Sequence, residues 1–456
     1  PRLSEQAKLV MRSHTPYLDP EPFSLISTRH ELDHYLEHEI LPYLDHPGET
    51  VLDVLPVTDF QARCVTSALT SPLGRCYHFY MDLPEGTDIG RLIHACIKLW
   101  DNLDILRAVF IKGQDGFLQV VGKKLRPIID VYETKGDLAT FSQTVYDKDL
   151  ACPLKLGRSF TRFLITHASD GQKRLTMRLC HAQYDGICLE RIISCLAACY
   201  NGRELPAIPQ FAGYLKHAIV HRTAARDYWR SFLHGSRITK MRLSADTTNV
   251  HNKASLPGQL IELKKTCPVP QCRNGLTPAT LFTALSACAL ARSTKSSDVV
   301  FGLVVSGRSM LPSGLQDVVG PCLNIIPIRV RFTDDGMLDS ALKCVEEQRL
   351  GGLQFETSQF NDIVEHCTDW PGEPKDFGVV IQFQNIEENP TTDISGESSQ
   401  LNVHERVDVI DTPVVAILAK PVQGFWNLEV VASGTLYSQH DIAAMLEELL
   451  ALIESV

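Results

Sequence analysis

One short segment of the chain combines a histidine and an aspartate at a spacing that suits acid–base chemistry. Residues 179–186 read LCHAQYDG, and they join a predicted strand to a predicted helix. Side chains alternate along a strand, so His181 shares a face with Leu175 and Leu179. We therefore expect His181 to point towards an apolar interior at the end of that strand.

A neutral imidazole in this place keeps a basic nitrogen near physiological pH. His181 is thus a candidate general base for an amine or hydroxyl nucleophile. Asp185, at the start of the helix, can cap the helix or pair with an arginine. The alternative is that His181 is a structural core histidine and Asp185 only a helix cap.

The elements that must position this segment alternate between strands and helices, which predicts an α/β (α+β) fold. For the first half we predict a leading helix at 29–44, strands at 76–83, 159–166 and 173–180, a hairpin at 107–121, and helices at 88–103, 138–150 and 187–200.

A second half with the same alternation of strands and helices follows a pair of predicted helices at 211–221 and 223–233. We place the boundary between two lobes near Arg222, which divides the chain into a linker and leading helix at 1–49, a first lobe at 50–222 and a second lobe at 223–456. The second lobe is predicted to hold strands at 259–265, 299–305, 324–332 and 379–383, a helix opened by Thr277-Pro278, and helices at 337–354 and 439–453. Residues 387–400 are predicted to be a mobile loop.

Composition excludes several classes of function. The formal net charge of the 456 residues is −10, with no run of Lys or Arg that could follow a phosphate backbone, so nucleic acid is not an expected partner. The longest apolar stretch, residues 281–291, is too short to cross a bilayer. We expect a cytoplasmic, monomeric domain.

The fourteen cysteines include no CxxC pair, and a chain of this length needs no disulfide framework, so reduced thiols are expected. HxxxD lacks the HExxH spacing and no Cys/His cluster supplies a ligand set, so no metal site is predicted. The chain begins at Pro1 without an initiator Met, and we expect a neighbouring domain upstream.

Five segments together resemble the motifs of the condensation domains of nonribosomal peptide synthetases, which are related to chloramphenicol acetyltransferase. HxxxDG at His181 resembles their active-site motif. The others, in the order of the family, are VLPVTDFQ at 54–61, DILRAVF at 104–110, RDYW at 226–229, and a late motif with Ser306-Gly307-Arg308, Val319-Gly320-Pro321 and Asn324. The resemblance covers residues 51–456. It implies two chloramphenicol-acetyltransferase-like lobes arranged as a V with a central tunnel.

The resemblance also implies roles for single residues. His181 would be the catalytic histidine, and the carboxylate of Asp185 would pair with Arg107. Gly186 would let the donor thioester approach closely. The predicted tunnel-lining residues are Cys180, Tyr184, Ser306, Arg308 and Asn324. A segment at 382–389 is expected to bridge the lobes as a latch.

Two departures from the family pattern refine the expected function. Elongating condensation domains carry two adjacent histidines, whereas Cys180 precedes His181 here, which resembles fungal terminal condensation-like domains that cyclise a peptide off its carrier. A nucleophilic Cys180 is an alternative, although strand alternation turns it away from His181. Residues 376–379 begin like the DFGWG signature of CoA-dependent plant acyltransferases but lack its Trp.

The resemblance therefore predicts amide-forming release of a peptidyl thioester with His181 as general base. The domain would bind no cofactor itself. Its substrate would arrive on the 4'-phosphopantetheine of a peptidyl carrier domain upstream in the same polypeptide. The alternatives are an elongating condensation domain, an epimerisation domain, a CoA-dependent acyltransferase and a non-catalytic recruitment module.

Overall fold

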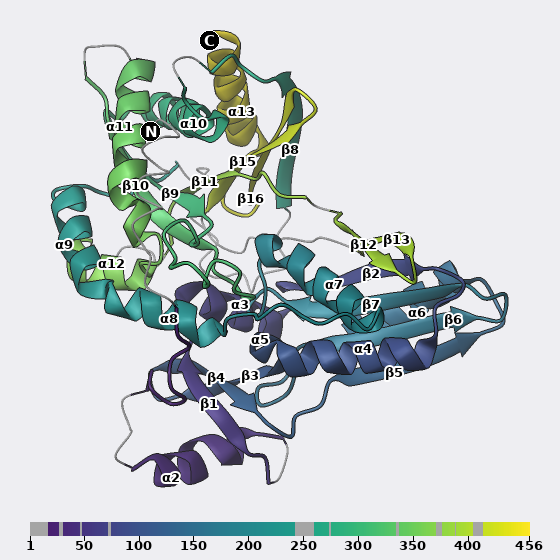
Figure 1. The fold of residues 1–456 in the computed structure, drawn as a ribbon. Helices are drawn as coiled ribbons and strands as arrows, with labels where there is room; N and C mark the ends of the chain where they lie inside the picture. Colours follow the sequence, from purple (N-terminus) through teal and green to yellow (C-terminus); the bar gives the residue numbers. More distant parts are fainter. Residues whose placement is uncertain are drawn as a thin grey trace.

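Two lobes built on separate sheets make up the computed structural model, which describes residues 17–26, 31–45, 48–71, 74–241, 260–272, 275–333, 337–370, 376–387, 389–404 and 414–456. The lobes meet near α3 and α8 and diverge from there as a V (Figure 1). The fold is mixed α/β, as predicted.

The first lobe contains a five-stranded sheet of order β14-β2-β7-β6-β5 and a three-stranded sheet of order β1-β4-β3. Its leading segment forms α2 (Leu32–Tyr35), η2 (Leu36–Ile40) and η3 (Leu41–Tyr43). Its strands are β1 (Val51–Pro56), β2 (Cys76–Leu83), β3 (Ala108–Gly113), β4 (Gly116–Gly122), β5 (Ile128–Thr134), β6 (Arg162–Ala168) and β7 (Lys173–Cys180), and its helices are α3 (Asp59–Thr70), α4 (Ile89–Asn102), α5 (Asp104–Arg107), α6 (Leu138–Leu150), α7 (Gly186–Tyr200) and α8 (Phe211–Val220).

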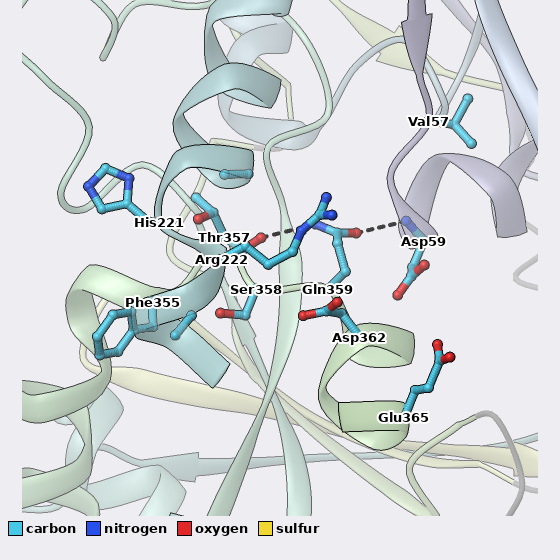
Figure 2. Close-up of a pocket in the computed structure, with 12 residues that line it drawn as sticks. Val57, Asp59, His221, Arg222, Phe355, Thr357, Ser358, Gln359, Asp362 and Glu365 are labelled. Carbon is cyan, nitrogen blue, oxygen red and sulfur yellow. Dashed lines mark hydrogen bonds between the residues drawn. The ribbon is translucent and has the colours of Figure 1, made fainter. Parts of the chain in front are cut away.

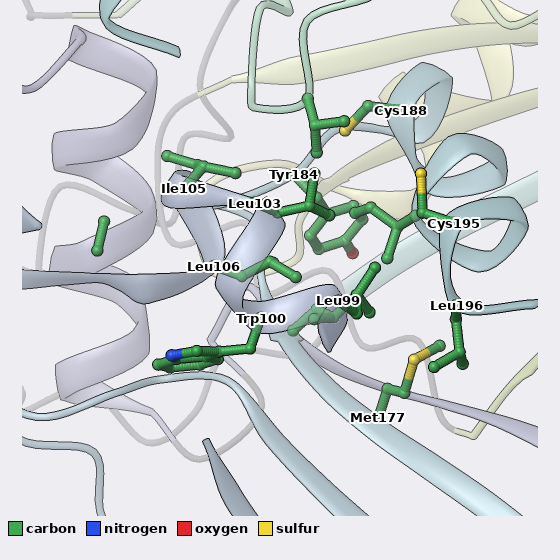
Figure 3. Packing of buried hydrophobic residues seen from close by; sticks show 14 of the residues in the cluster. Leu99, Trp100, Leu103, Ile105, Leu106, Met177, Tyr184, Cys188, Cys195 and Leu196 are labelled. Carbon is green, nitrogen blue, oxygen red and sulfur yellow. The ribbon is translucent and has the colours of Figure 1, made fainter. Parts of the chain in front are cut away.

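Strand alternation assigns the two faces of this sheet. Met177 of β7 is fully buried with Leu99 and Trp100 of α4 and Leu196 of α7 (Figure 3). The neighbouring Arg178 points the other way, to Asp149 of α6. His181 follows directly on β7, so it lies at the end of the strand, on the face of the sheet that α4 and α7 cover.

The second lobe has a six-stranded sheet of order β10-β9-β11-β15-β16-β8. Its centre is α10, whose residues from Thr280 to Ala291 are all buried, so the longest apolar stretch of the sequence is a core helix. The elements are β8 (Leu260–Pro268), β9 (Asp298–Val305), β10 (Asn324–Arg331), β11 (Val379–Phe383), β15 (Val415–Val422), β16 (Phe425–Ser433), α9 (Arg222–Leu233), α10 (Pro278–Thr294), α11 (Met337–Gly352), η5 (Leu353–Phe355), α12 (Phe360–Cys367) and α13 (Gln439–Glu454).

One segment of the second half crosses to the first lobe. The hairpin of β12 (Thr391–Ile394) and β13 (Glu397–Gln400) packs against α7, and β14 (Asn402–Val403) pairs with β2. The prediction of a loop at 387–400 was therefore wrong for residues 391–400. Leu401 lies between β13 and β14 and is fully buried in the first core, which explains why this polar segment is ordered.

The loop between β9 and β10 also contributes to the first core. Leu311, Leu315 and Cys322, from the loop between β9 and β10, are buried with the residues of α7 and α8 rather than with the second core. Among the described residues, no helix is long and apolar enough to cross a membrane.

Candidate functional site

His181 lies just beyond β7 in a fixed orientation. Its backbone N–H donates to the carbonyl of Arg75 at 2.7 Å, and its side-chain Nδ1 lies 2.8 Å from the carbonyl oxygen of Tyr184. A carbonyl can only accept, so Nδ1 carries the proton and donates. The lone pair of the neutral imidazole is then on Nε2, the nitrogen that can take a proton from a nucleophile.

Aromatic rings surround the His181 imidazole. Tyr184 stacks on it at a centroid distance of 4.8 Å, Phe60 of α3 meets it edge-on at 5.0 Å, and Tyr77 of β2 lies at 6.0 Å. Tyr184 is itself 3% exposed and packed in the first core (Figure 3). The imidazole is thus held by packing as well as by its hydrogen bond, and it stays half-buried.

Asp185 caps α7 and joins the two lobes. Its Oδ1 accepts from the Cys188 N–H at 3.0 Å, and its Oδ2 accepts from Arg308 Nη1 at 2.6 Å. The same Oδ2 accepts the N–H groups of Cys322 and Leu323, at 2.9 and 3.1 Å. With 1% of Asp185 exposed, this carboxylate is fully used in holding the HxxxDG turn against the second lobe.

The predicted partner of Asp185 was wrong. Arg107 ends α5 and faces the buried carboxyl of Asp104, whose pKa burial raises to about 6 against the lowering effect of the Arg107 charge. The Nε of Arg107 is buried without a hydrogen-bond partner among the described residues. Arg308 reaches Asp185 instead because its loop turns back over the start of α7.

Arg308 also organises its own loop. The guanidinium donates to the carbonyl oxygen of Gly320 at 3.0 Å, and the backbone N–H of Arg308 donates to the hydroxyl of Ser306 at 3.1 Å. From the other side, the buried carboxyl of Glu356 hydrogen-bonds with Ser309 and the backbone of Gly307, while its burial raises its pKa. Ser306 and Arg308 keep some exposed surface.

Gly186 does not face open space. A Cβ on it would lie 2.4 Å from Cδ1 of Ile386, a residue in the predicted bridging segment 382–389. The second lobe thus contacts the start of α7 through this segment as well. The predicted approach of a thioester over Gly186 would require the Ile386 side chain to move.

Three of the predicted tunnel-lining residues are buried. Cys180 has no exposed surface and faces Cys76 across β2 and β7, so its prediction as a lining residue was wrong. Burial and the hydrogen bond with Cys76 raise the pKa of the Cys180 thiol well above its ordinary value. Asn324 is 5% exposed, and its amide donates to the carbonyls of Glu356 and Ser358; Tyr184 lies behind His181.

Gln183, inside the motif, was missed as a supporting residue. Its side chain is fully buried, donates to the Ile105 carbonyl at 3.0 Å and accepts from the Thr161 hydroxyl at 3.1 Å. Gln61 of α3 donates to the Ala182 carbonyl at 2.9 Å. The sequence does carry a signal for the start of α3, because Thr58 and Gln61 have the spacing of a capping box.

A cavity of about 250 Å³ lies between the lobes at the start of α3 (Figure 2). Its wall includes Asp59 from the first lobe and Gln359 from the second, and the Asp59 N–H donates to Gln359 Oε1 at 2.8 Å. Its lining residues include none of the predicted site residues. Sequence reasoning missed α12, which forms one wall.

Within the described ranges, no group of three His, Cys, Asp or Glu side chains could hold a metal ion.

The chain is similar to known proteins in sequence. Residues 51–456 match the family described as the Condensation domain. The chain is 43% identical over 454 residues to the nonribosomal peptide synthetase ungA' of Aspergillus campestris, covering 98% of this chain and 5% of that protein. It is 34% identical over 380 residues to the cyclosporin synthetase simA of Tolypocladium inflatum, covering 83% of this chain and 2% of that protein.

Solved structures share the fold. A crystal structure described as CT superimposes with a TM-score of 0.80 and 25% identity, over 95% of this chain and 97% of that one. The starter condensation domain of rhizomide synthetase RzmA matches with a TM-score of 0.66 and 17% identity, over 88% and 94% of the two chains. The chain therefore belongs to the condensation domain family, as represented in the fungal nonribosomal peptide synthetases, and has its chloramphenicol-acetyltransferase-like fold.

Proposed function

We propose that this chain releases a carrier-bound peptidyl thioester by intramolecular amide formation, as a terminal condensation-like domain with His181 as general base. The observation that carries the proposal is the hydrogen bond from His181 Nδ1 to the Tyr184 carbonyl, because it leaves the lone pair on Nε2. The His181 imidazole keeps some exposed surface, whereas the Cys180 thiol beside it in sequence is fully buried.

In the proposed reaction, an amine or amide nitrogen of the peptide attacks the thioester carbonyl. The new C–N bond forms, the C–S bond breaks, and Nε2 of His181 takes the proton of the nitrogen and returns it to the leaving pantetheine sulfur. Positioning supplies much of the rate, since effective molarities of well-oriented groups reach about 10⁵ M or more. The substrate carries both reacting groups, so one carrier suffices.

The sequence feature that supports release over elongation is Cys180, which stands where elongating domains have a first histidine. The structure gives it no exposed surface, so it offers no second imidazole or thiol to the reaction. The partner we propose is a peptidyl carrier domain upstream in the same polypeptide, presenting the peptide on 4'-phosphopantetheine. This chain spans about 5% of the relative ungA', which leaves room there for further domains.

The test is the mass of the released product when a carrier loaded with a peptidyl thioester is joined to this chain. A product lighter than the linear acid by one water supports cyclisation. Linear acid would indicate a hydrolase, and transfer only to an added downstream carrier would indicate an elongating domain. Turnover of free acyl-CoA without a carrier would select a CoA-dependent acyltransferase, and deuterium wash-in at an α-carbon without release would select an epimerisation domain. Retained pathway output after loss of His181 would select a recruitment module.

A further inference from the structure

A short segment before β1 is bound at the junction of the lobes. Asp19 Oδ1 accepts from the backbone N–H of Gln210 at 3.1 Å and from the hydroxyl of Tyr17 at 2.8 Å. Gln210 is the N-cap of α8 and makes no side-chain capping bond of its own. Asp19 therefore binds the N–H of the N-cap residue of α8 from a distant part of the chain, at the end of the helix where a carboxylate complements the helix dipole.

Tyr17 fills a slot that is open because Gly213 of α8 has no side chain. A Cβ on Gly213 of α8 would lie 1.6 Å from the Tyr17 hydroxyl oxygen, so only glycine admits the ring there. On the other side, a Cβ on Gly314, in the loop between β9 and β10, would be 3.6 Å from Tyr17 Cβ. One tyrosine thus touches a helix of the first lobe and a loop of the second.

The slot is connected to the HxxxDG turn through α8. Phe211 packs so closely on Gly320 that a Cβ there would lie 2.3 Å from the ring. The hydroxyl of Tyr214 donates to the Cys322 carbonyl at 3.0 Å, and the Cys322 N–H in turn donates to Asp185. The anchored segment therefore lies within a few contacts of the turn that carries His181.

From this geometry we infer that Tyr17 and Asp19 form an anchor for the chain arriving from an N-terminal carrier domain. The inference rests on the carrier-dependent function proposed above. An anchor at the lobe junction holds the chain that leads to the carrier at a fixed point beside α8, so the connection between carrier and site is shorter than it would be without the anchor. A shorter tether raises the effective concentration of the carrier-bound thioester at the site. Tyr17 is then a positioning residue that touches no reacting atom.

The test joins a peptidyl carrier domain to the N-terminal end of this chain and compares two substrates. One is a peptide loaded on the joined carrier, and the other is the same peptide as a diffusible N-acetylcysteamine thioester. We expect Tyr17→Ala and Gly213→Ala to slow loss of the carrier-bound peptide about tenfold, through a lower effective concentration, and to leave turnover of the diffusible thioester unchanged. Tyr17→Phe keeps the ring in the slot and should behave closer to wild type, and Tyr43→Ala, at a residue that is 55% exposed, is the matched control. Unchanged loss from the carrier, or an equal fall for both substrates, would overturn the inference.

A second measurement separates this inference from the function on which it rests. A fluorescent pantetheine on the joined carrier and an acceptor dye on the exposed thiol of Cys152 report the spread of carrier positions without any reaction. Energy transfer should show a broader distribution in Tyr17→Ala than in wild type. An unchanged distribution contradicts the anchor even if cyclic product forms, and a broadened one supports it even if the product proves to be the linear acid.

Discussion

The carboxylate of Asp185 lies 2.6 Å from Nη1 of Arg308, and only 1% and 9% of the two side chains are exposed. One residue starts α7 in the first lobe and the other follows β9 in the second. This ion pair therefore fixes the turn that carries His181 relative to the loop of the second lobe.

Removing one charge of that pair should be costly. We expect Asp185→Asn to lower the free energy of unfolding by about 3 to 5 kcal/mol, because it leaves a buried guanidinium without its counter-charge. Asp82→Asn is the matched control, since Asp82 pairs with Arg174 but is 63% exposed, and an exposed pair contributes about 1 kcal/mol or less. Denaturant unfolding measures both, and equal losses would contradict a buried, lobe-joining pair.

Replacing His181 should strongly slow product release without unfolding the domain. His181→Ala removes a half-buried ring, so the melting temperature should change little, while product release should fall by about 10²- to 10⁴-fold if the imidazole is the general base. His94→Ala, on the exposed side of α4, controls for loss of a histidine. Release close to the wild-type rate in His181→Ala would refute the base assignment.

Cys180 should be dispensable for chemistry. Because its thiol is buried and its pKa is raised, Cys180→Ala should keep near wild-type turnover while losing about 0.5 to 3 kcal/mol of stability, as is usual for core substitutions. Iodoacetamide should label the exposed Cys152 and spare Cys180 in the folded protein. Inactivation that tracks alkylation of Cys180 would favour an acyl-enzyme.

The contact between Gly186 and Ile386 should appear as coupling between two substitutions. Gly186→Ala places a methyl group where Cδ1 of Ile386 now lies, an overpacking that costs about 1 to 3 kcal/mol. Ile386→Ala should relieve that cost, so the double variant should be more stable than the sum of the single effects. Strictly additive effects in denaturant unfolding would show that the two side chains do not meet in solution.

Acidification should weaken the crossing segment at His404. Burial is the main cause that lowers the pKa of His404 from 6.5 to about 4. The ring stacks on Tyr146 and lies against Tyr80, with His78, Arg174 and Asp147 as its charged or titratable neighbours. Between pH 6.5 and 4 the unfolded chain binds the extra proton, so stability falls as the pH falls through this window.

His404→Phe keeps an aromatic ring but does not titrate. We expect its melting temperature to depend less on pH between 6.5 and 4 than that of the wild type, with the two curves converging in shape above pH 7. Parallel curves across the whole window would show that His404 does not contribute.

The elements carrying the motif were predictable because each has a strong local signal. Strand β7 and helix α6 have the predicted bounds, and Thr277 caps α10 as expected. Ion pairs between residues far apart in the sequence were not predictable. Asp185 pairs with Arg308 and not with Arg107 because of the tertiary structure, which no local sequence pattern encodes. Alternation along β7 turns Cys180 away from His181, and this local signal contradicts the role of a tunnel-lining residue that the family resemblance implies.

Strand β14 makes the sheet of the first lobe depend on a segment that is synthesised after most of the second lobe. Asn402 pairs with Tyr80 on β2, so this edge of the sheet stays unpaired while the intervening residues are being made. An open strand edge invites pairing with other chains. During synthesis, this edge of β2 therefore stays open until residues 402–403 have left the ribosome.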